Sequence, residues 1–307
     1  MTCLLNSILA LNLACVAAFL STGSGASLPL RGLANEAQNG APSMFTGPDN
    51  THHTPESGPR SWFGPALAIS LAFVFAVVVP SPAQAGGKPT AQVLLIGNSF
   101  TKGVKRDLKK ILKERGYRAK VTARARNGAT LNVHARSKST YKAIARKQWD
   151  WVVLQEQSLG TFHVRYPDAR ALDAAVKAEG LQTAFFMTWR DRGWELITYD
   201  SLRGEIGDDV GYVPIANELN ATIAPVGWAW RTSVAENTPI DLWKSDGHHA
   251  NSAGNYLAAM VLYASLYQDS PIGLKPGKKL ASAQADYLQS LADRTVFADP
   301  NAWNIGS

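Results

Sequence analysis

Short apolar runs alternate with amphipathic stretches from residue 91 onward, and this alternation constrains the fold more than any other feature of the sequence. Ala91–Ile96 and Asp150–Leu154 are nearly continuous apolar runs, which is typical of parallel strands covered on both faces. Between them, Val104–Arg115 has the apolar spacing of an amphipathic helix. Strands are expected at Ala91–Ile96, Arg118–Ala123, Asp150–Leu154, Thr183–Thr188 and Thr222–Val226, and helices at Val104–Arg115, Ser139–Lys147, Asp168–Ala178, Val213–Leu219, Asn251–Tyr267 and Ala281–Asp293. The order predicts an α/β fold with a parallel sheet of about five strands joined by right-handed crossovers.

The first 85 residues are expected to form a leader outside this fold. Leu4–Leu20 and Trp62–Pro80 are apolar, and residues 21–61 between them are polar without periodicity, which indicates disorder. The second apolar run is followed by Ala83-Gln84-Ala85, the pattern of a secretory signal peptide cleaved after Ala85. We therefore expect a secreted or periplasmic protein whose folded part is one domain, residues 86–307.

Two alternatives for the leader stay open. The run at residues 62–80 is close to the roughly 20 residues that span a bilayer, so an uncleaved leader would anchor the protein to a membrane. Met44 is an alternative translation start, which would make the residues before it an extension of the gene model.

Both cysteines, Cys3 and Cys15, lie in the expected leader. The domain that follows therefore has no cysteine nucleophile, no cysteine-ligated zinc and no disulfide framework. Hydrophobic residues make up 46% of the chain and charged residues 18%, which is typical of a globular protein.

Residues of catalytic type follow the expected strands. Ser99 follows the first strand at a strand-to-helix turn, Gly128 follows the second, and Gln155 and Gln157 follow the third. In an open parallel sheet, ligands bind beyond the carboxyl ends of the strands. The backbone N–H groups of Ser99 and Gly128, with the side-chain amide of Gln157, predict an oxyanion hole there.

Asp246 and His249 stand three residues apart just before the last long apolar helix. A serine hydroxyl needs a base to remove its proton, and an imidazole base needs a carboxylate to fix its tautomer. One short turn can aim both side chains at the same point, so the sequence predicts Ser99 as nucleophile, His249 as base and Asp246 as the residue that orients the base.

These motifs resemble those of the SGNH/GDSL hydrolase superfamily. Gly97-Asn98-Ser99-Phe100-Thr101 is similar to the first block of that family, Gly128 to the second, and Asp246-Gly247-His248-His249 to the fifth. The resemblance spans Ala91–Tyr267 and implies a flavodoxin-like, three-layer α/β/α sandwich with a Ser99-His249-Asp246 triad.

The third block departs from the family. Its usual Gly-x-Asn-Asp is replaced by Gln155-Glu156-Gln157-Ser158, as in a largely uncharacterised branch with an LQEQS-like block. Gln157 takes the position of the oxyanion-hole asparagine, and Gln155 is the alternative donor.

Trp189, Arg190 and Trp194 lie in a loop after the fourth strand and are candidates for substrate binding. A tryptophan at this position either stacks on a sugar or serves the core. The arginine either meets an anionic substrate or is solvated.

No metal or organic cofactor is expected. His248 and His249 are adjacent, but neighbours in an extended turn point apart and no third ligand is evident. His134 and His163 are expected to be surface or loop residues.

The charge of the expected domain is divided unevenly along the chain. Residues 86–148 contain 17 Lys and Arg against two acidic residues, whereas residues 149–307 contain 12 against 19. The first expected helix and its preceding turn carry Lys102, Lys105, Arg106, Lys109, Lys110 and Lys113. Such a face is either simply solvated or binds an anionic polysaccharide or lipid surface. Nucleic acid is not an expected partner, because no nucleic-acid-binding motif accompanies the charge.

Together these features predict an exported serine esterase that hydrolyses a carboxylic ester, with O-acetyl groups on a carbohydrate as the preferred substrate class. The alternatives are an acyltransferase to a glycan that uses the same triad, and a non-catalytic glycan-binding protein of the cell envelope.

Overall fold

A parallel sheet of five strands lies at the centre of the part of the chain that the computed structural model describes, residues 88–158, 166–204 and 211–306. In spatial order the strands are β2 (Arg118–Ala125), β1 (Thr90–Gly97), β3 (Trp151–Leu154), β4 (Gln182–Phe186) and β5 (Thr222–Ala224). Every neighbouring pair is parallel. The expected leader, residues 1–85, lies outside the described residues.

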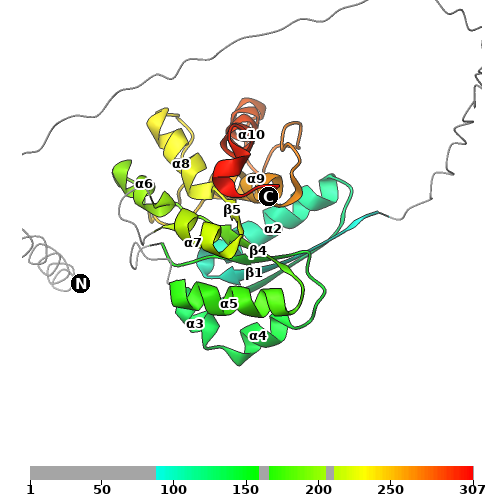
Figure 1. Cartoon of the computed structure of the whole chain (residues 1–307). Helices are drawn as coiled ribbons and strands as arrows, with labels where there is room; N and C mark the ends of the chain where they lie inside the picture. Colours follow the sequence, from blue (N-terminus) through cyan, green and yellow to red (C-terminus); the bar gives the residue numbers. More distant parts are fainter. Residues whose placement is uncertain (1–87, 159–165, 205–210, 307) are drawn as a thin grey trace, which may run out of the picture. The chain divides into compact units, whose positions relative to one another are not determined.

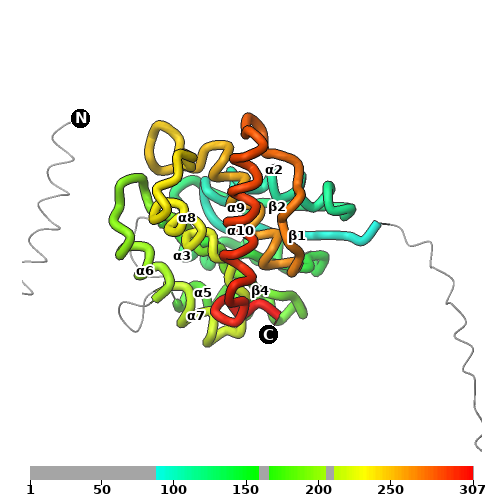
Figure 2. The backbone as a smooth tube through the Cα atoms, turned by 90° about the horizontal axis from the view of Figure 1, so that it is seen from above, coloured from blue at the N-terminus to red at the C-terminus, as the bar shows by residue number. Residues whose placement is uncertain are grey.

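Helices cover both faces of the sheet (Figure 1). One face is covered by α2 (Ser99–Glu114), α8 (Val226–Ala235), α9 (Ser252–Tyr267) and α10 (Ser282–Phe297). The other face is covered by α3 (Leu131–Ala135), α4 (Lys138–Ile144), α5 (Tyr166–Ala178) and α7 (Tyr212–Leu219). α6 (Ile197–Arg203) contacts α7 and α8, and α9 and α10 lie side by side (Figure 2). The expected three-layer α/β/α fold class is confirmed.

The burial of each strand follows from its place in the sheet. β1 lies between two strands and two helix layers, so Ala91 and Val93–Ile96 are almost completely buried. β2 is an edge strand, and it exposes Arg118 and Lys120 while burying Val121.

α9 is buried on nearly its whole circumference, as its uniformly apolar sequence requires. Its first turn is capped by the Asn251 side-chain oxygen, which accepts hydrogen bonds from Ala253 N at 2.8 Å and Gly254 N at 3.1 Å. Because the capped helix is embedded in the core, it fixes the backbone position of the residues that immediately precede it, including His249.

All the expected strands and long helices are present, with ends shifted by a few residues. Three helices of the described residues, α3, α6 and α8, were not expected from the sequence. β5 ends at Ala224, two residues before the expected end of the last strand at Val226, because α8 begins at Val226. Gly227 sits where a Cβ atom would lie 1.9 Å from the Thr188 carbonyl oxygen, so it allows α8 to pack closely against the chain after β4.

Within the described ranges, no helix combines the length and the apolarity that crossing a bilayer requires.

Candidate active site

Ser99 is the first residue of α2 and follows directly on β1. The preceding Asn98 caps the helix: its side-chain oxygen accepts a hydrogen bond from Phe100 N at 3.0 Å. Gly97 must lack a side chain, because a Cβ atom there would lie 2.4 Å from both Gln155 Oε1 and Thr101 Oγ1. The turn thereby holds the Ser99 hydroxyl at the carboxyl edge of the sheet.

The three residues of the predicted triad are connected by two consecutive hydrogen bonds. Ser99 Oγ is 2.9 Å from His249 Nε2, and His249 Nδ1 is 2.8 Å from Asp246 Oδ2. A carboxylate can only accept, so the proton on this imidazole is on Nδ1, and Nε2 is free to accept from the Ser99 hydroxyl. This is the arrangement that a serine nucleophile and its base require.

The Asp246 carboxylate is held ionised by its own turn. Its Oδ1 accepts hydrogen bonds from the backbone N–H of His248 at 3.0 Å and of His249 at 2.9 Å. These two backbone bonds, followed by the bond from the His249 ring, hold the pKa of Asp246 far below its usual range. Gly247 makes the turn possible, since its φ of +66° is in the left-handed region.

Two backbone N–H groups are available for an oxyanion. Across the described ranges, no protein acceptor takes the N–H of Ser99 or of Gly128. Gly128 has a φ of +67° and is exposed beside the nucleophile turn. Asn98 links the two segments, because its Nδ2 lies 3.4 Å from the Ala129 carbonyl oxygen.

The two glutamines of the third block differ in what they do. Gln155 is fully buried: its Oε1 accepts from Asn98 N at 2.9 Å and Thr101 Oγ1 at 2.8 Å, and its Nε2 donates to the Glu156 carbonyl at 2.5 Å. The alternative assignment of Gln155 to the oxyanion hole is therefore wrong, since its amide is already used to hold the nucleophile turn. Gln157 is half-buried and stays the candidate for the third donor.

Glu156 was not singled out from the sequence, although it is a buried carboxylate between the two glutamines. Both of its oxygens lie 3.2 Å from Leu131 N, and Oε1 also accepts from Gln157 N at 2.7 Å. It thereby ties the segment after Gly128 to the segment that carries Gln157. The only sequence signal was an acidic residue immediately after a buried strand.

The expectation that Trp189 contacts substrate is wrong. Its side chain is fully buried and stacks on Phe100, with ring centroids 4.1 Å apart, and on Trp230 at 4.4 Å. Its Nε1 donates to the His248 carbonyl at 3.0 Å. Trp189 thus lies between the residue after the nucleophile and the residue before the base, and it fixes the distance between the two halves of the triad.

Arg190 is likewise buried and cannot reach an anionic substrate. Its guanidinium donates to the carbonyl oxygens of Ser158 at 2.7 Å and Thr198 at 3.0 Å, and to Ser201 Oγ at 3.1 Å. It holds neighbouring loops together. Trp194 differs from both: it is 37% exposed, and the Arg190 guanidinium lies 5.4 Å from its ring centroid.

A second histidine–carboxylate pair adjoins the triad. His248 Nδ1 lies 2.6 Å from Asp191 Oδ1, and its ring packs edge-on against the ring of His249 at 4.8 Å. The hydrogen bond to Asp191 raises the pKa of His248.

His134 is buried, so the expectation of a surface position is wrong. Its Nε2 lies 2.8 Å from the Gly97 carbonyl oxygen, and burial lowers its pKa. Through this contact with Gly97, His134 stabilises the turn that carries Ser99. His163 lies outside the described residues. In the described segments, no group of three or more His, Cys, Asp or Glu side chains is arranged to hold a metal ion.

No protein-family model matches the chain, and no curated protein is significantly similar to it in sequence. Solved structures do resemble it. A DUF4886 family protein from Bacteroides uniformis is 18% identical with a TM-score of 0.57, covering 68% of this chain and 96% of that one. A protein from Slackia heliotrinireducens proposed to be an SGNH hydrolase is 28% identical with a TM-score of 0.45, covering 56% and 97%. The esterase EstA from a Pseudoalteromonas species is 12% identical with a TM-score of 0.43, covering 57% and 96%.

The fold is the three-layer sandwich that the sequence motifs imply, and Ser99, His249 and Asp246 meet at its carboxyl edge in the order expected of a Ser-His-Asp triad. The similarity to the DUF4886 family protein supports the fold class predicted from the sequence.

Proposed function

We propose that this protein is an exported serine esterase that hydrolyses a carboxylic ester, with O-acetyl groups on a carbohydrate as its substrate class. The observation that carries the proposal is the continuous hydrogen-bonded sequence from Ser99 Oγ through His249 to Asp246, at 2.9 and 2.8 Å. Export is supported by the sequence pattern before residue 86.

In the acylation step, Ser99 Oγ forms a bond to the acyl carbon while His249 Nε2 takes the hydroxyl proton. The carbonyl oxygen becomes an oxyanion, and we assign its stabilisation to the N–H groups of Ser99 and Gly128 and the amide of Gln157. Collapse of this intermediate breaks the bond to the alcohol, and His249 donates its proton to the leaving oxygen.

In the second step, His249 removes a proton from water as the water oxygen attacks the acyl-enzyme. The acid leaves and Ser99 recovers its proton from His249. Asp246 stays ionised throughout and stabilises the imidazolium that forms in each half of the reaction.

The carbohydrate part of the proposal is supported by Trp194, whose ring is exposed on the loop after β4. A flat aromatic face of this kind can pack against the C–H face of a sugar. The Arg190 guanidinium over the ring helps to fix its orientation.

The test is labelling with a fluorophosphonate probe together with hydrolysis of p-nitrophenyl acetate. We expect the probe to modify Ser99, and Ser99→Ala to lose labelling and at least about 10³-fold in kcat. Full activity of Ser99→Ala would overturn the proposal, and sugar binding without labelling would favour a non-catalytic glycan-binding protein.

Two further measurements address the finer parts. Product analysis with an acceptor sugar present separates hydrolysis from acyl transfer, because a transferase passes the acetyl group to the sugar instead of to water. N-terminal sequencing of exported protein tests the cleavage after Ala85; a mature N-terminus before residue 80 would contradict it.

A further inference from the structure

The nucleophile and a row of cations share one face of α2. Counting from Ser99, positions 102, 106, 110 and 113 recur at spacings of three or four residues, which places them on the same side of a helix. Lys102, Arg106, Lys110 and Lys113 occupy these positions, and all four are exposed. At about 1.5 Å per residue, Arg106 and Lys110 lie about 10 and 16 Å along the axis from Ser99. The row therefore begins at the catalytic site and leads away from it.

Acidic residues compensate little of this charge. Arg106 pairs with the neighbouring Asp107 at 3.4 Å, and Lys102 Nζ donates to the uncharged Asn127 Oδ1 at 3.1 Å. In the described part of the chain, no carboxylate forms an ion pair with Lys110 or Lys113. This side of α2 therefore presents positive charge to solvent.

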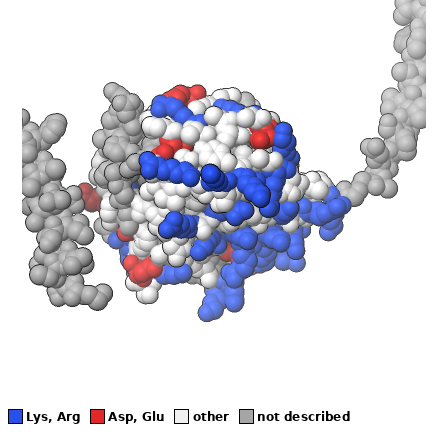
Figure 3. All heavy atoms as spheres, turned by 90° about the horizontal axis from the view of Figure 1, so that it is seen from below, with Lys and Arg blue, Asp and Glu red and all other residues white. Residues whose placement is uncertain are grey.

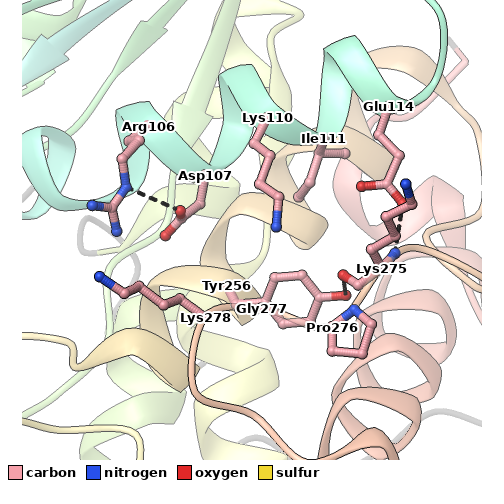
Figure 4. Close-up of a pocket in the computed structure, with 10 residues that line it drawn as sticks. All are labelled: Arg106, Asp107, Lys110, Ile111, Glu114, Tyr256, Lys275, Pro276, Gly277 and Lys278. Atoms are coloured by element: carbon pink, nitrogen blue, oxygen red, sulfur yellow. Dashed lines mark hydrogen bonds and ion pairs between the residues drawn. The ribbon is translucent and has the colours of Figure 1, made fainter.

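A cavity of about 500 Å³ opens beside this row, between α2 and the loop at residues 275–278 (Figure 4). Its apolar lining comes from Ile111 of α2, Tyr256 of α9 and Pro276 of the loop. Arg106 and Lys110 reach it from the helix, and Lys275 and Lys278 line it from the loop. Four cations from two separate elements thus line one cavity, against the two carboxylates of Asp107 and Glu114, and a merely solvated helix face does not require this arrangement.

The loop is fastened to the helix, so the cavity exists before any ligand arrives. Glu114 Oε1 accepts a hydrogen bond from Lys275 N at 2.5 Å, and Tyr256 Oη donates to the Lys275 carbonyl at 3.1 Å. Gly277 lies so close to the Tyr256 ring that a Cβ atom there would approach its Cγ to 2.9 Å. The Glu114 carboxylate is thereby occupied by the loop backbone.

We propose that this cation row and cavity bind a carboxylated polysaccharide, and that an ester on the same polymer is presented to Ser99. The inference rests on the proposed esterase function and names its substrate class. Carboxylates along the polymer would meet Arg106, Lys110, Lys275 and Lys278, while a sugar C–H face packs on the exposed Pro276.

The same face does not suit a lipid surface. Helices that lie on membranes bury exposed apolar side chains among the lipids. The exposed large hydrophobic residues of the described chain are Val133, Trp194, Ile197, Val234 and Ile272. None of them belongs to α2, whose exposed positions carry only charged side chains.

Positive charge alone does not single out α2. Figure 3, which views the molecule from the α3–α5 side, shows a second surface crowded with Lys and Arg. Lys138 and Lys142 of α4 are exposed cations on that side. Reversing their charge supplies a control that matches the change in net charge without touching the cavity.

The binding test uses the full chain with Ser99→Ala, carboxymethyl dextran as the probe and unmodified dextran as the uncharged polymer with the same backbone. We expect binding to carboxymethyl dextran only, weakening as salt screens the charges. Lys110→Glu with Lys278→Glu should raise Kd by about tenfold or more, and Lys138→Glu with Lys142→Glu by less than about twofold. Equal effects of the two double variants would overturn the proposal. So would binding to phosphatidylglycerol vesicles without binding to carboxymethyl dextran.

The kinetic test compares acetate release by the active enzyme from O-acetylated carboxymethyl dextran and O-acetylated dextran. We expect a lower KM for the charged polymer. Lys110→Glu with Lys278→Glu should remove this difference by raising the KM for the charged polymer, whereas the control double variant Lys138→Glu with Lys142→Glu should keep it. Equal KM values for both polymers would reject the polysaccharide site while the esterase stands. No acetate from either polymer, with no probe labelling of Ser99, would instead reject the esterase function itself.

Discussion

The side-chain oxygen of Gln155 lies 2.9 Å from the backbone nitrogen of Asn98, the residue before the nucleophile. The same oxygen accepts from Thr101 Oγ1 at 2.8 Å, so one buried amide at the end of β3 holds both sides of the turn that carries Ser99. The unusual third block therefore has a structural role at this position, and Gln157 stays the candidate for a contribution to the chemistry.

Replacing Gln155 with leucine removes these bonds at nearly constant volume. We expect Gln155→Leu to lose about 2–4 kcal/mol of unfolding free energy, because Asn98 N–H and the Thr101 hydroxyl are left buried without a partner. The kcat for p-nitrophenyl acetate should fall as well. Urea unfolding and steady-state kinetics measure the two effects. Thr101→Val, which removes a single bond, should cost less, and a larger loss for Thr101→Val would contradict this account.

Glu156 is expected to position the oxyanion hole through the backbone of Leu131 and Gln157. In Glu156→Gln, one acceptor oxygen becomes an NH₂ group facing backbone N–H donors. We expect a loss of about 1–3 kcal/mol in stability and a fall in kcat that exceeds any change in KM. Glu218→Gln, which removes an exposed partner of Arg170, is the control and should leave kcat unchanged. An unchanged kcat in Glu156→Gln would show that the hydrogen bonds of the Glu156 carboxylate to Leu131 N and Gln157 N do not influence the site.

Asp246→Asn tests the orientation of the catalytic base. The new amide would present its NH₂ group to His249 Nδ1, which favours the proton on Nε2 and leaves no acceptor for the Ser99 hydroxyl. We expect kcat to fall by about 10²–10⁴-fold with the fold intact, as measured by ester hydrolysis and circular dichroism. Retention of more than about a tenth of the activity would mean that the carboxylate does not set the tautomer.

The strands of the sheet could be predicted from the sequence because each is buried on one or both faces. Continuous apolar runs such as Val93–Ile96 indicate this burial directly. The contacts among Ser99, His249 and Asp246 could also be predicted, since Asp246 and His249 lie on one turn and Ser99 follows a strand. Helices α3 and α6, with five and seven residues, offer little of a helical period, but α4 also has seven residues and was predicted, so length alone does not explain the difference.

Side-chain direction in loops was the part that sequence could not supply. Trp189 and Trp194 stand five residues apart in one loop, yet one is fully buried and the other 37% exposed. Arg190 looked like a ligand for an anion, but its donors are used by backbone carbonyls at 2.7 and 3.0 Å. Which of two nearby polar residues turns inward depends on the packing of the whole edge of the sheet, as with Gln155 and Gln157.

The pair formed by His248 and Asp191 predicts a stability difference that depends on pH. Ionised Asp191 accepts a hydrogen bond from the ring at 2.6 Å and raises the pKa of His248 above its unfolded value of about 6.5. A raised folded pKa means that the contribution to stability is complete below the unfolded pKa and is lost as pH rises through the folded one.

Asp191→Asn should therefore destabilise the protein more at pH 6 than at pH 9, by about 1 kcal/mol at the lower pH. Urea unfolding at the two pH values measures this. Asp241→Asn is the matched control, because Asp241 pairs at 2.7 Å with Arg192, which keeps its charge over this range, and its effect should be the same at both pH values. Equal losses for Asp191→Asn at pH 6 and pH 9 would mean that the pair makes no charge-dependent contribution. In that case the raised pKa of His248 could not be assigned to Asp191.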